Sequence, residues 1–274
     1  MTTEIRKALK QDIPALCDIW KACFSDSDEY VKLFYDENFE RIEVLALFVN
    51  EKPVSMINLL DASFADEKAH RKSKLIYATG TLPEHRKKGY MGALIEHVTD
   101  KAKKEDFALF LKPSSPSLIK YYKKYGFELD SYFRLITVTP NKKQDISASD
   151  LSYKEYNRMR DAHFSKAPYV KWQDEHLRWC AAENEYFNGK TLKLRQNGNE
   201  HFLMCYPEGR HLIISETDMS LTQIKELSGA LCDMFSTEAI KAYVPDTFSE
   251  GERIVSSLVY NAELKNYYVN LILI

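Results

Sequence analysis

The residues best suited to chemistry lie in LPEHRKKGYMGALIEH, residues 82–97. Three cations, Arg86, Lys87 and Lys88, precede Gly89, and a second glycine follows three positions later. The first turn of a helix has backbone N–H groups without intrahelical partners, and the helix dipole adds partial positive charge there. A phosphate laid across that turn satisfies both, and glycine lets the anion approach the backbone. The pattern therefore predicts an anion-binding loop at the start of a helix.

The loop differs from two common phosphate-binding signatures. It lacks the GxxxxGK[ST] of a P-loop and the GxGxxG of a dinucleotide-binding turn. Short glycine motifs also arise by chance, so these residues alone leave open both a phosphate site and an ordinary solvated loop. The elements around the loop are needed to decide between them.

The elements expected around the loop alternate between strands and helices. Runs rich in apolar and β-branched residues predict strands, and apolar residues at helical spacing predict helices. The expected strands are 43–50, 54–64, 74–82, 107–111 and 132–140, and the expected helices are 12–24, 28–39, the segment after Gly89, and 117–127. The wholly apolar run 107–111 follows a helix, which predicts a buried strand parallel to the strand 74–82. Ser117 is expected to cap the last of these helices, and Gly126 to follow its end.

The second half of the chain repeats this order more loosely, which predicts an internal structural duplication. Residues 141–150 are polar and lack periodicity, so they are expected to form a linker. At the strand-to-helix turn of the second half the chain reads ISETDMSLTQIKEL, with Glu216 and Asp218 and no glycine. Acids at that turn would repel a pyrophosphate, so this half is expected not to bind one.

Two motifs resemble those of the GNAT superfamily of acyl-CoA-dependent N-acyltransferases. PEHRKKGYMGAL resembles motif A, whose pattern [RQ]-x-x-G-x-[GA] lies between the fourth strand and the third helix of the family. Arg86 and Gly89 fit this pattern, whereas Met91 stands at its last position and the glycine follows at Gly92. A bulkier residue there is similar to the enhanced intracellular survival acetyltransferases. Downstream, YYKKYGFE resembles the family signature LYxKxGF, with Tyr122 on its tyrosine.

The resemblance implies an α/β (α+β) protein with the GNAT fold, in which a mixed, mostly antiparallel sheet has a splayed central strand pair. It covers residues 1–140, which are expected to form a GNAT acetyltransferase domain that binds acetyl-CoA. Residues 141–150 would be the linker. For residues 151–274 the resemblance is architectural only, and it implies a second, degenerate GNAT-like domain without a coenzyme A site.

The resemblance also assigns cofactor-binding roles within the first domain. Backbone groups of Thr79, Gly80 and Thr81 would bind the pantetheine arm as an added strand would. The pyrophosphate would be held near Arg86 by the backbone N–H groups of Lys87, Lys88, Gly89, Tyr90, Met91 and Gly92. Ser115 stands where relatives often carry an asparagine that contacts the cofactor, and a plain loop position is the alternative.

By the same resemblance, Tyr122 would be the general acid. A thiolate leaves when the thioester is cleaved, and a phenol with a pKa of about 10 can supply a proton to it. The alternative is a core aromatic residue, since Leu118 lies four residues earlier on the same helical face. The general base is not identified, because residues 76–81 contain no acid. Glu84 and His85 are near in sequence, but both are expected to be structural or solvated.

The composition argues against several classes of protein. The formal net charge of −2 offers no basic surplus for nucleic acid. No apolar run reaches the roughly 18 residues that a membrane-spanning helix needs. The cysteines number five, without CxxC spacing, and the histidines are dispersed. No metal site is therefore expected, and a reducing, cytoplasmic location is expected.

The resemblance therefore implies an N-acetyltransferase that moves the acetyl group of acetyl-CoA directly to a primary amine of a small molecule or peptide. The acidic and aromatic stretch 23–39 suits a cationic amine, although the same residues could cap and pack a helix. Two alternatives stay open: a non-catalytic acyl-CoA-binding or regulatory module, and transfer from aminoacyl-tRNA. Phosphate-cofactor binding and turnover distinguish the three. The acceptor, the acyl length and the oligomeric state are not indicated by the sequence.

Overall fold

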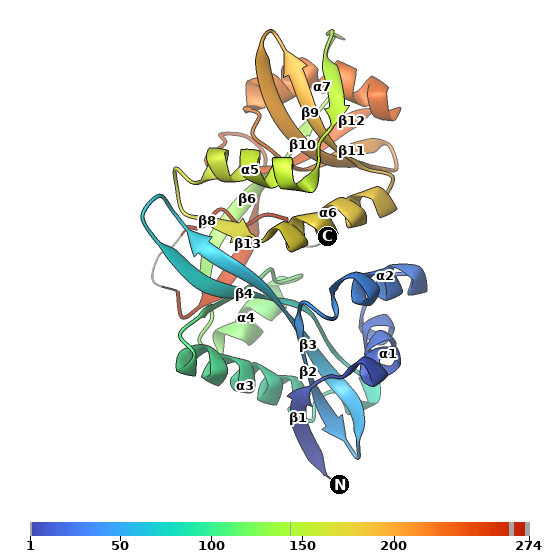
Figure 1. The fold of residues 1–274 in the computed structure, drawn as a ribbon, viewed down its shortest axis with the longest axis vertical. Coiled ribbons are helices and arrows are strands. Elements are labelled where there is room, and N and C mark those ends of the chain that lie inside the picture. Colours follow the sequence, from blue (N-terminus) through green and yellow to red (C-terminus); the bar gives the residue numbers. More distant parts are fainter. Residues whose placement is uncertain (1, 143, 263–265, 272–274) are drawn as a thin grey trace. The chain divides into compact units, whose positions relative to one another are not determined.

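The computed structural model describes residues 2–142, 144–262 and 266–271 (Figure 1). The chain divides into two compact units. Unit 1 comprises Met1–Ser63, Arg71–Leu129 and Leu258–Glu263, and unit 2 comprises Phe64–His70, Asp130–Ser257 and Leu264–Ile274. Each unit therefore includes a segment that is distant along the sequence from the rest of that unit.

Unit 1 is built on a mixed sheet in the order β1-β2-β3-β4-β5-β13. Its strands are β1 (Thr3–Lys7), β2 (Glu43–Val49), β3 (Lys52–Ala65), β4 (His70–Thr81), β5 (Ala108–Leu111) and the end of β13 (Glu252–Tyr260). The pairs β1–β2 and β2–β3 are antiparallel, and β4–β5 is parallel. This is the mixed α/β architecture that the sequence predicts, with the parallel pair joined through a helix.

The helices of unit 1 cover both faces of this sheet. They are α1 (Ile13–Cys23), α2 (Asp28–Asn38), α3 (Tyr90–Lys104) and α4 (Pro116–Lys123). Helices α1 and α2 lie on one side of strands β2–β4, and α3 and α4 lie on the other (Figure 1). The apolar stripe of α3 is buried against the sheet, since Leu94, Ile95 and Val98 are each 0% exposed.

The parallel strands β4 and β5 pair only where they begin. Ser73–Leu75 pair with Ala108–Phe110, and among the described residues this ladder does not continue into the second half of β4. The end of β4, Ile76–Thr81, therefore diverges from β5, as the expected splayed pair requires. A strand with unpaired backbone groups can accept an extended ligand as an additional strand.

A segment from the far end of the sequence completes the sheet of unit 1. Leu258, Val259 and Tyr260 of β13 pair antiparallel with the far edge of β5. Tyr260 also packs beside Phe127, with ring centroids 5.4 Å apart. A Cβ on Gly126 would come within 3.1 Å of the Tyr260 ring, so the glycine that follows α4 also makes room for this tyrosine.

Unit 2 has a sheet in the order β6-β12-β11-β10-β9-β7. The strands of this order are β6 (Glu128–Val138), β7 (Ser147–Asp150), β9 (Lys190–Gln196), β10 (Asn199–Glu208), β11 (His211–Thr217) and β12 (Ala239–Pro245). Unit 2 also contains β8 (Tyr169–Trp172) and the first part of β13. As in unit 1, one parallel pair, β11–β12, follows an antiparallel meander and is joined through a helix. This order agrees with the expected duplication.

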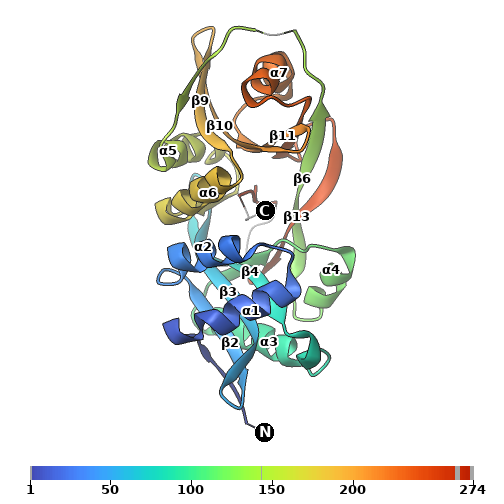
Figure 2. The same ribbon diagram turned by 90° about the vertical axis from the view of Figure 1, so that its right-hand side faces the viewer.

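The helices of unit 2 are α5 (Tyr153–Phe164), α6 (Asp174–Tyr186) and α7 (Leu221–Phe235). Helices α5 and α6 pack together on one face of the sheet, and α7 lies on the other (Figure 2). The apolar core under α7 includes Leu194, Ile214, Ile224, Leu231 and Ile240, all of which are 0% exposed.

Two local expectations differ from the structure. Residues 147–150, placed in the linker by their polarity, form β7 and pair with β9. An exposed edge strand can be polar on both faces, so its sequence carries little hydrophobic signal. The N-cap of α4 is Ser115 rather than Ser117, because Pro116 occupies the first helical position.

Candidate active site

The head of α3 is an open loop in a left-handed backbone conformation. Gly89 is the N-cap with φ +81° and ψ 0°, and Lys87 has φ +62°. A Cβ on Gly89 would meet nothing within 4 Å, so its conformation rather than a close approach requires glycine there. The first helical hydrogen bond runs from Ala93 N to Gly89 O, at 3.0 Å.

Backbone donors gather at this loop. The N–H groups of residues 87–92 donate to no acceptor among the described residues. The side chains of Lys87 and Lys88 are exposed beside them. Open N–H groups, a helix dipole and two exposed cations therefore occur at the head of α3, where the sequence predicts an anion site.

Arg86 and Gly92 have structural partners that the sequence does not indicate. The Arg86 guanidinium donates to Thr81 O at 3.1 Å and to Ala22 O at 3.4 Å, which links the end of β4 to α1. A Cβ on Gly92 would come within 2.5 Å of the Tyr125 hydroxyl oxygen. Gly92 is therefore needed for the close packing of Tyr125 against α3.

Two buried polar side chains hold the diverging end of β4. Asn58 Nδ2 donates to the carbonyls of Tyr77 and Ala78, both at 3.3 Å. Ala78 has φ +45°, a strained conformation for a residue with a Cβ, and strain of this kind gathers at functional sites. Ser55 Oγ donates to Gly80 O at 3.0 Å, which holds β4 two residues further along.

Tyr122 on α4 reaches this same strand. Its hydroxyl lies 3.2 Å from Thr79 Oγ1, and its side chain is buried. Burial raises the pKa of Tyr122, and the hydrogen bond with Thr79 opposes that rise only in part. The phenol therefore stays neutral at physiological pH, as a hydrogen-bond and proton donor must. The ring is held between Tyr121 and Phe127, with centroids at 5.5 and 5.6 Å.

Of the other expected site residues, Thr81 is tied through its hydroxyl to Ser55 at 2.7 Å. Gly80 packs against α1, where a Cβ would come within 3.0 Å of Cys23 Sγ. The Ser115 hydroxyl lies 2.8 Å from that of Ser117 and does not cap the helix backbone. The structure thus brings Thr79 and Tyr122 together, whereas Gly80 and Thr81 contact α1 and Ser55 and the Ser115 hydroxyl contacts Ser117.

An aromatic cluster borders β4 on the α1–α2 side. Trp20 is 1% exposed and lies within 6.4 Å, between ring centroids, of Tyr30, Phe34 and Tyr77. Its indole N–H donates to Asp26 Oδ2 at 2.7 Å. Most of the aromatic residues of this stretch are therefore core residues, while Asp26 is a fixed carboxylate at its exposed edge.

Sequence reasoning missed Asn58 and Ser55, which hold the strand that carries the site. Both lie in VSMINLL, an otherwise apolar run that forms the middle of β3. A polar residue inside a buried strand must satisfy its hydrogen bonds. The presence of two polar residues in an otherwise apolar run could therefore have indicated that both have specific partners. Among the described residues, no carboxylate or imidazole lies within hydrogen-bonding distance of Tyr122 or Thr79, so the general base is still unassigned.

The corresponding turn of unit 2 is closed by its own side chains. At the start of α7, Ser220 and Gln223 form a capping box that occupies the N–H groups of these two residues. Asp218 accepts from Phe202 N at 3.0 Å, and its other oxygen lies 3.3 Å from His201 Nδ1. Glu216 is fully buried in an ion pair with Arg160 at 2.8 Å. This helix start therefore has fewer open donors than that of α3, and the acidic side chain of Asp218 precedes it.

The described residues contain no cluster of histidine, cysteine or acidic side chains that could hold a metal ion. None of the helices in the described ranges is both long and apolar enough to cross a membrane.

Residues 4–129 match the family model of the acetyltransferase (GNAT) domain. Comparison with curated proteins gives no match. Among solved structures, a conserved protein from Enterococcus faecalis, described as a probable N-acyltransferase, is similar to this chain with a TM-score of 0.73 and 13% identity, over 94% of this chain and 72% of that one.

A GCN5-related N-acetyltransferase from Anabaena variabilis gives a TM-score of 0.71 and 14% identity, over 94% of this chain and 72% of that one. Eis1 from Mycobacterium abscessus gives 0.61 and 14%, over 90% of this chain and 66% of that one. Similarity at these identities establishes the fold. The family match identifies residues 4–129, a little under half of the chain, as similar to a GNAT acetyltransferase domain.

Proposed function

We propose that unit 1 is an acetyl-CoA-dependent N-acetyltransferase, and that it transfers the acetyl group directly to a primary amine. The observation that carries the proposal is the contact between Tyr122 and Thr79 at the diverging end of β4, 3.2 Å between their hydroxyl oxygens. A thioester whose pantetheine arm lies along this end of β4 would have its sulfur near the phenol.

The head of α3 supplies the anion site of this proposal. Backbone N–H groups of residues 87–92 would hold the pyrophosphate, assisted by the exposed cations Lys87 and Lys88. Arg86 supports the site indirectly, because its guanidinium holds the end of β4 against α1. The pantetheine amides would bond backbone groups near Thr79, where β4 has left β5.

In the proposed reaction the neutral amine attacks the thioester carbon. The C–N bond forms, the C–S bond breaks, and the leaving thiolate takes the proton of Tyr122. The amine nitrogen loses its proton to water, and the phenol is reprotonated from solvent. Burial keeps the phenol neutral, so it can donate its proton in this step. General acid catalysis of this kind typically raises the rate 10²–10⁴-fold.

The proposed acceptor is a small-molecule or peptide amine. The edge of the aromatic cluster presents Asp26, whose carboxylate is oriented by the Trp20 indole. A carboxylate beside exposed aromatic surface, such as Phe24 at 38% exposed, favours a cationic amine before it is deprotonated.

The proposal is tested by thiol release and amine acetylation across a panel of amines, with Tyr122→Phe and the matched control Tyr121→Phe. Both substitutions remove one hydroxyl from α4 and keep the ring. Tyr122→Phe is expected to lower kcat by roughly 10²-fold or more, with acetyl-CoA affinity within about threefold of the parent. Tyr121→Phe is expected to change kcat little. Equal rates for the two variants would reduce Tyr122 to a packing residue.

A further inference from the structure

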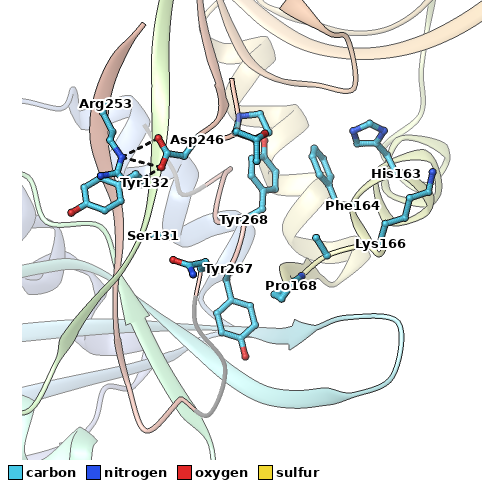
Figure 3. Close-up of a pocket in the computed structure, with 14 residues that line it drawn as sticks. Ser131, Tyr132, His163, Phe164, Lys166, Pro168, Asp246, Arg253, Tyr267 and Tyr268 are labelled. Atoms are coloured by element: carbon cyan, nitrogen blue, oxygen red, sulfur yellow. Dashed lines mark hydrogen bonds and ion pairs between the residues drawn. The ribbon is translucent and has the colours of Figure 1, made fainter. Parts of the chain in front are cut away.

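Unit 2 contains a cavity of about 420 Å³ that the acetyltransferase site does not use. One wall carries Tyr132 of β6, Asp246 after β12 and Arg253 of β13 (Figure 3). The opposite wall carries Phe164 at the end of α5 and Lys166 just beyond it. Its volume lies within the range of small-molecule pockets, roughly 300–1,000 Å³.

Flat surfaces line this cavity. Phe164 and Tyr268 stack with ring centroids 4.2 Å apart and planes 22° from parallel. On the other wall the Arg253 guanidinium carbon lies 3.5 Å from the centre of the Tyr132 ring. Aromatic rings and a guanidinium group on these walls favour a planar, unsaturated ring as the guest.

The cavity lining also carries a positive surplus, because it includes two cations, Arg253 and Lys166, and one carboxylate, Asp246. The Asp246 carboxylate accepts two hydrogen bonds from Arg253 Nε, at 3.0 and 2.9 Å, and lies 3.3 Å from Arg134 Nε. A single carboxylate is therefore shared by two guanidinium groups. Lys166 adds a further cation, and it forms no ion pair with a described residue.

The titratable groups facing Lys166 do not cancel this surplus. His163 lines the same wall, and burial lowers its pKa, an effect that Lys166 adds to and Asp218 opposes. The imidazole is therefore neutral at physiological pH. Asp161, the acid on α5 nearest in sequence, is engaged by Lys171 at 3.5 Å and by the Tyr169 hydroxyl at 3.1 Å.

We propose that this cavity binds a small organic anion with a planar aromatic ring. The ring lies against Phe164 and Tyr268, and the carboxylate or phosphate is attracted by Lys166 and by the unshared charge of the Arg134–Asp246–Arg253 cluster. The site is separate from the acetyl-CoA cradle, and it does not rest on the proposed function of unit 1.

The test is calorimetric titration of the intact chain in the presence of saturating coenzyme A, which blocks binding to the head of α3. The probes are 2-naphthoate and 2-naphthyl phosphate, which share a ring and differ in the anion, and the neutral 2-naphthamide. One site per chain is expected for at least one anion, and roughly tenfold weaker binding for the amide. The anion that binds more tightly shows whether the cavity prefers a carboxylate or a phosphate.

Two charge-reversed variants complete the test. Lys166→Glu is expected to weaken anion binding by roughly tenfold or more, since it replaces an attraction by a repulsion. Lys142→Glu makes the same change at an exposed position of unit 2 outside the cavity wall, and is expected to leave the affinity within about twofold. Amide binding as tight as that of the acids would overturn the proposal. So would equal effects of the two variants, or no binding of either anion to the folded chain.

Discussion

The proposed anion site at the head of α3 predicts a charge effect that can be separated from backbone strain. Gly89 has φ +81°, so most substitutions there would distort the loop as well as alter its charge. Asparagine and aspartate tolerate the left-handed region better than other side chains, and they are nearly equal in shape. Gly89→Asn and Gly89→Asp therefore form a matched pair that differs by one negative charge.

The size of the effect follows from the geometry of the loop. A Cβ on Gly89 meets nothing within 4 Å, so neither variant creates a clash with this chain. A carboxylate about 5 Å from one phosphate charge is repelled by about 1 to 3 kcal/mol, for effective dielectric constants between about 80 and 20. The aspartate variant should therefore bind acetyl-CoA roughly 5- to 150-fold more weakly than the asparagine variant.

Isothermal calorimetry at low and high salt measures this difference. The difference in acetyl-CoA affinity between the two variants should decrease as the salt concentration rises, because the loop is exposed and its charges are screened. Thermal unfolding of both variants serves as the control for folding. Equal acetyl-CoA affinities for two folded variants would refute the placement of the pyrophosphate at this helix start.

Three further predictions concern the remaining framework. Glu216→Gln leaves the fully buried Arg160 without its counter-charge and should lower the free energy of unfolding by about 3–5 kcal/mol, as urea denaturation would measure. Burial lowers the pKa of His176 to about 4, so the unfolded chain gains a proton below about pH 6.5 that the folded chain does not. Stability should fall by up to about 3 kcal/mol between pH 6.5 and 4, and His176→Gln should flatten that slope in chemical denaturation. A chain that ends at Pro140 lacks Leu258–Tyr260, which pair with β5. It should show no cooperative thermal unfolding by circular dichroism, because β5 then has an unpaired edge. A sharp unfolding transition would contradict this account of unit 1.

The elements of unit 1 could be predicted from the sequence because their signals are local. The helix after Gly89 has a strong apolar stripe, and the run 107–111 is wholly apolar, which distinguishes a buried parallel strand. The pairing of β13 with β5 could not be predicted in this way. It joins residues far apart in the chain, and each strand alone is compatible with several neighbours.

The candidate site was predictable in position rather than in detail. Glycine at position 89 is explained by the left-handed backbone conformation of the loop, whereas the sequence argument expected it for the close approach of an anion. Gly92 is explained by Tyr125, and Arg86 by carbonyl acceptors on neighbouring elements, and such contacts leave no trace in local spacing. Asn58 acts through the shape of β4, so only its polarity within an apolar strand could have drawn attention to it.

The central claim is that each chain binds one acetyl-CoA, at the head of α3. None is expected at the start of α7, where Ser220 and Gln223 form a capping box. The most direct measurement is the stoichiometry of acetyl-CoA binding to the intact chain by calorimetry. The account predicts a single site per chain, with the binding constant falling as salt rises. A folded protein that binds no acetyl-CoA would contradict the anion site proposed at the head of α3. Two equivalent sites would contradict the expectation that the start of α7 binds none.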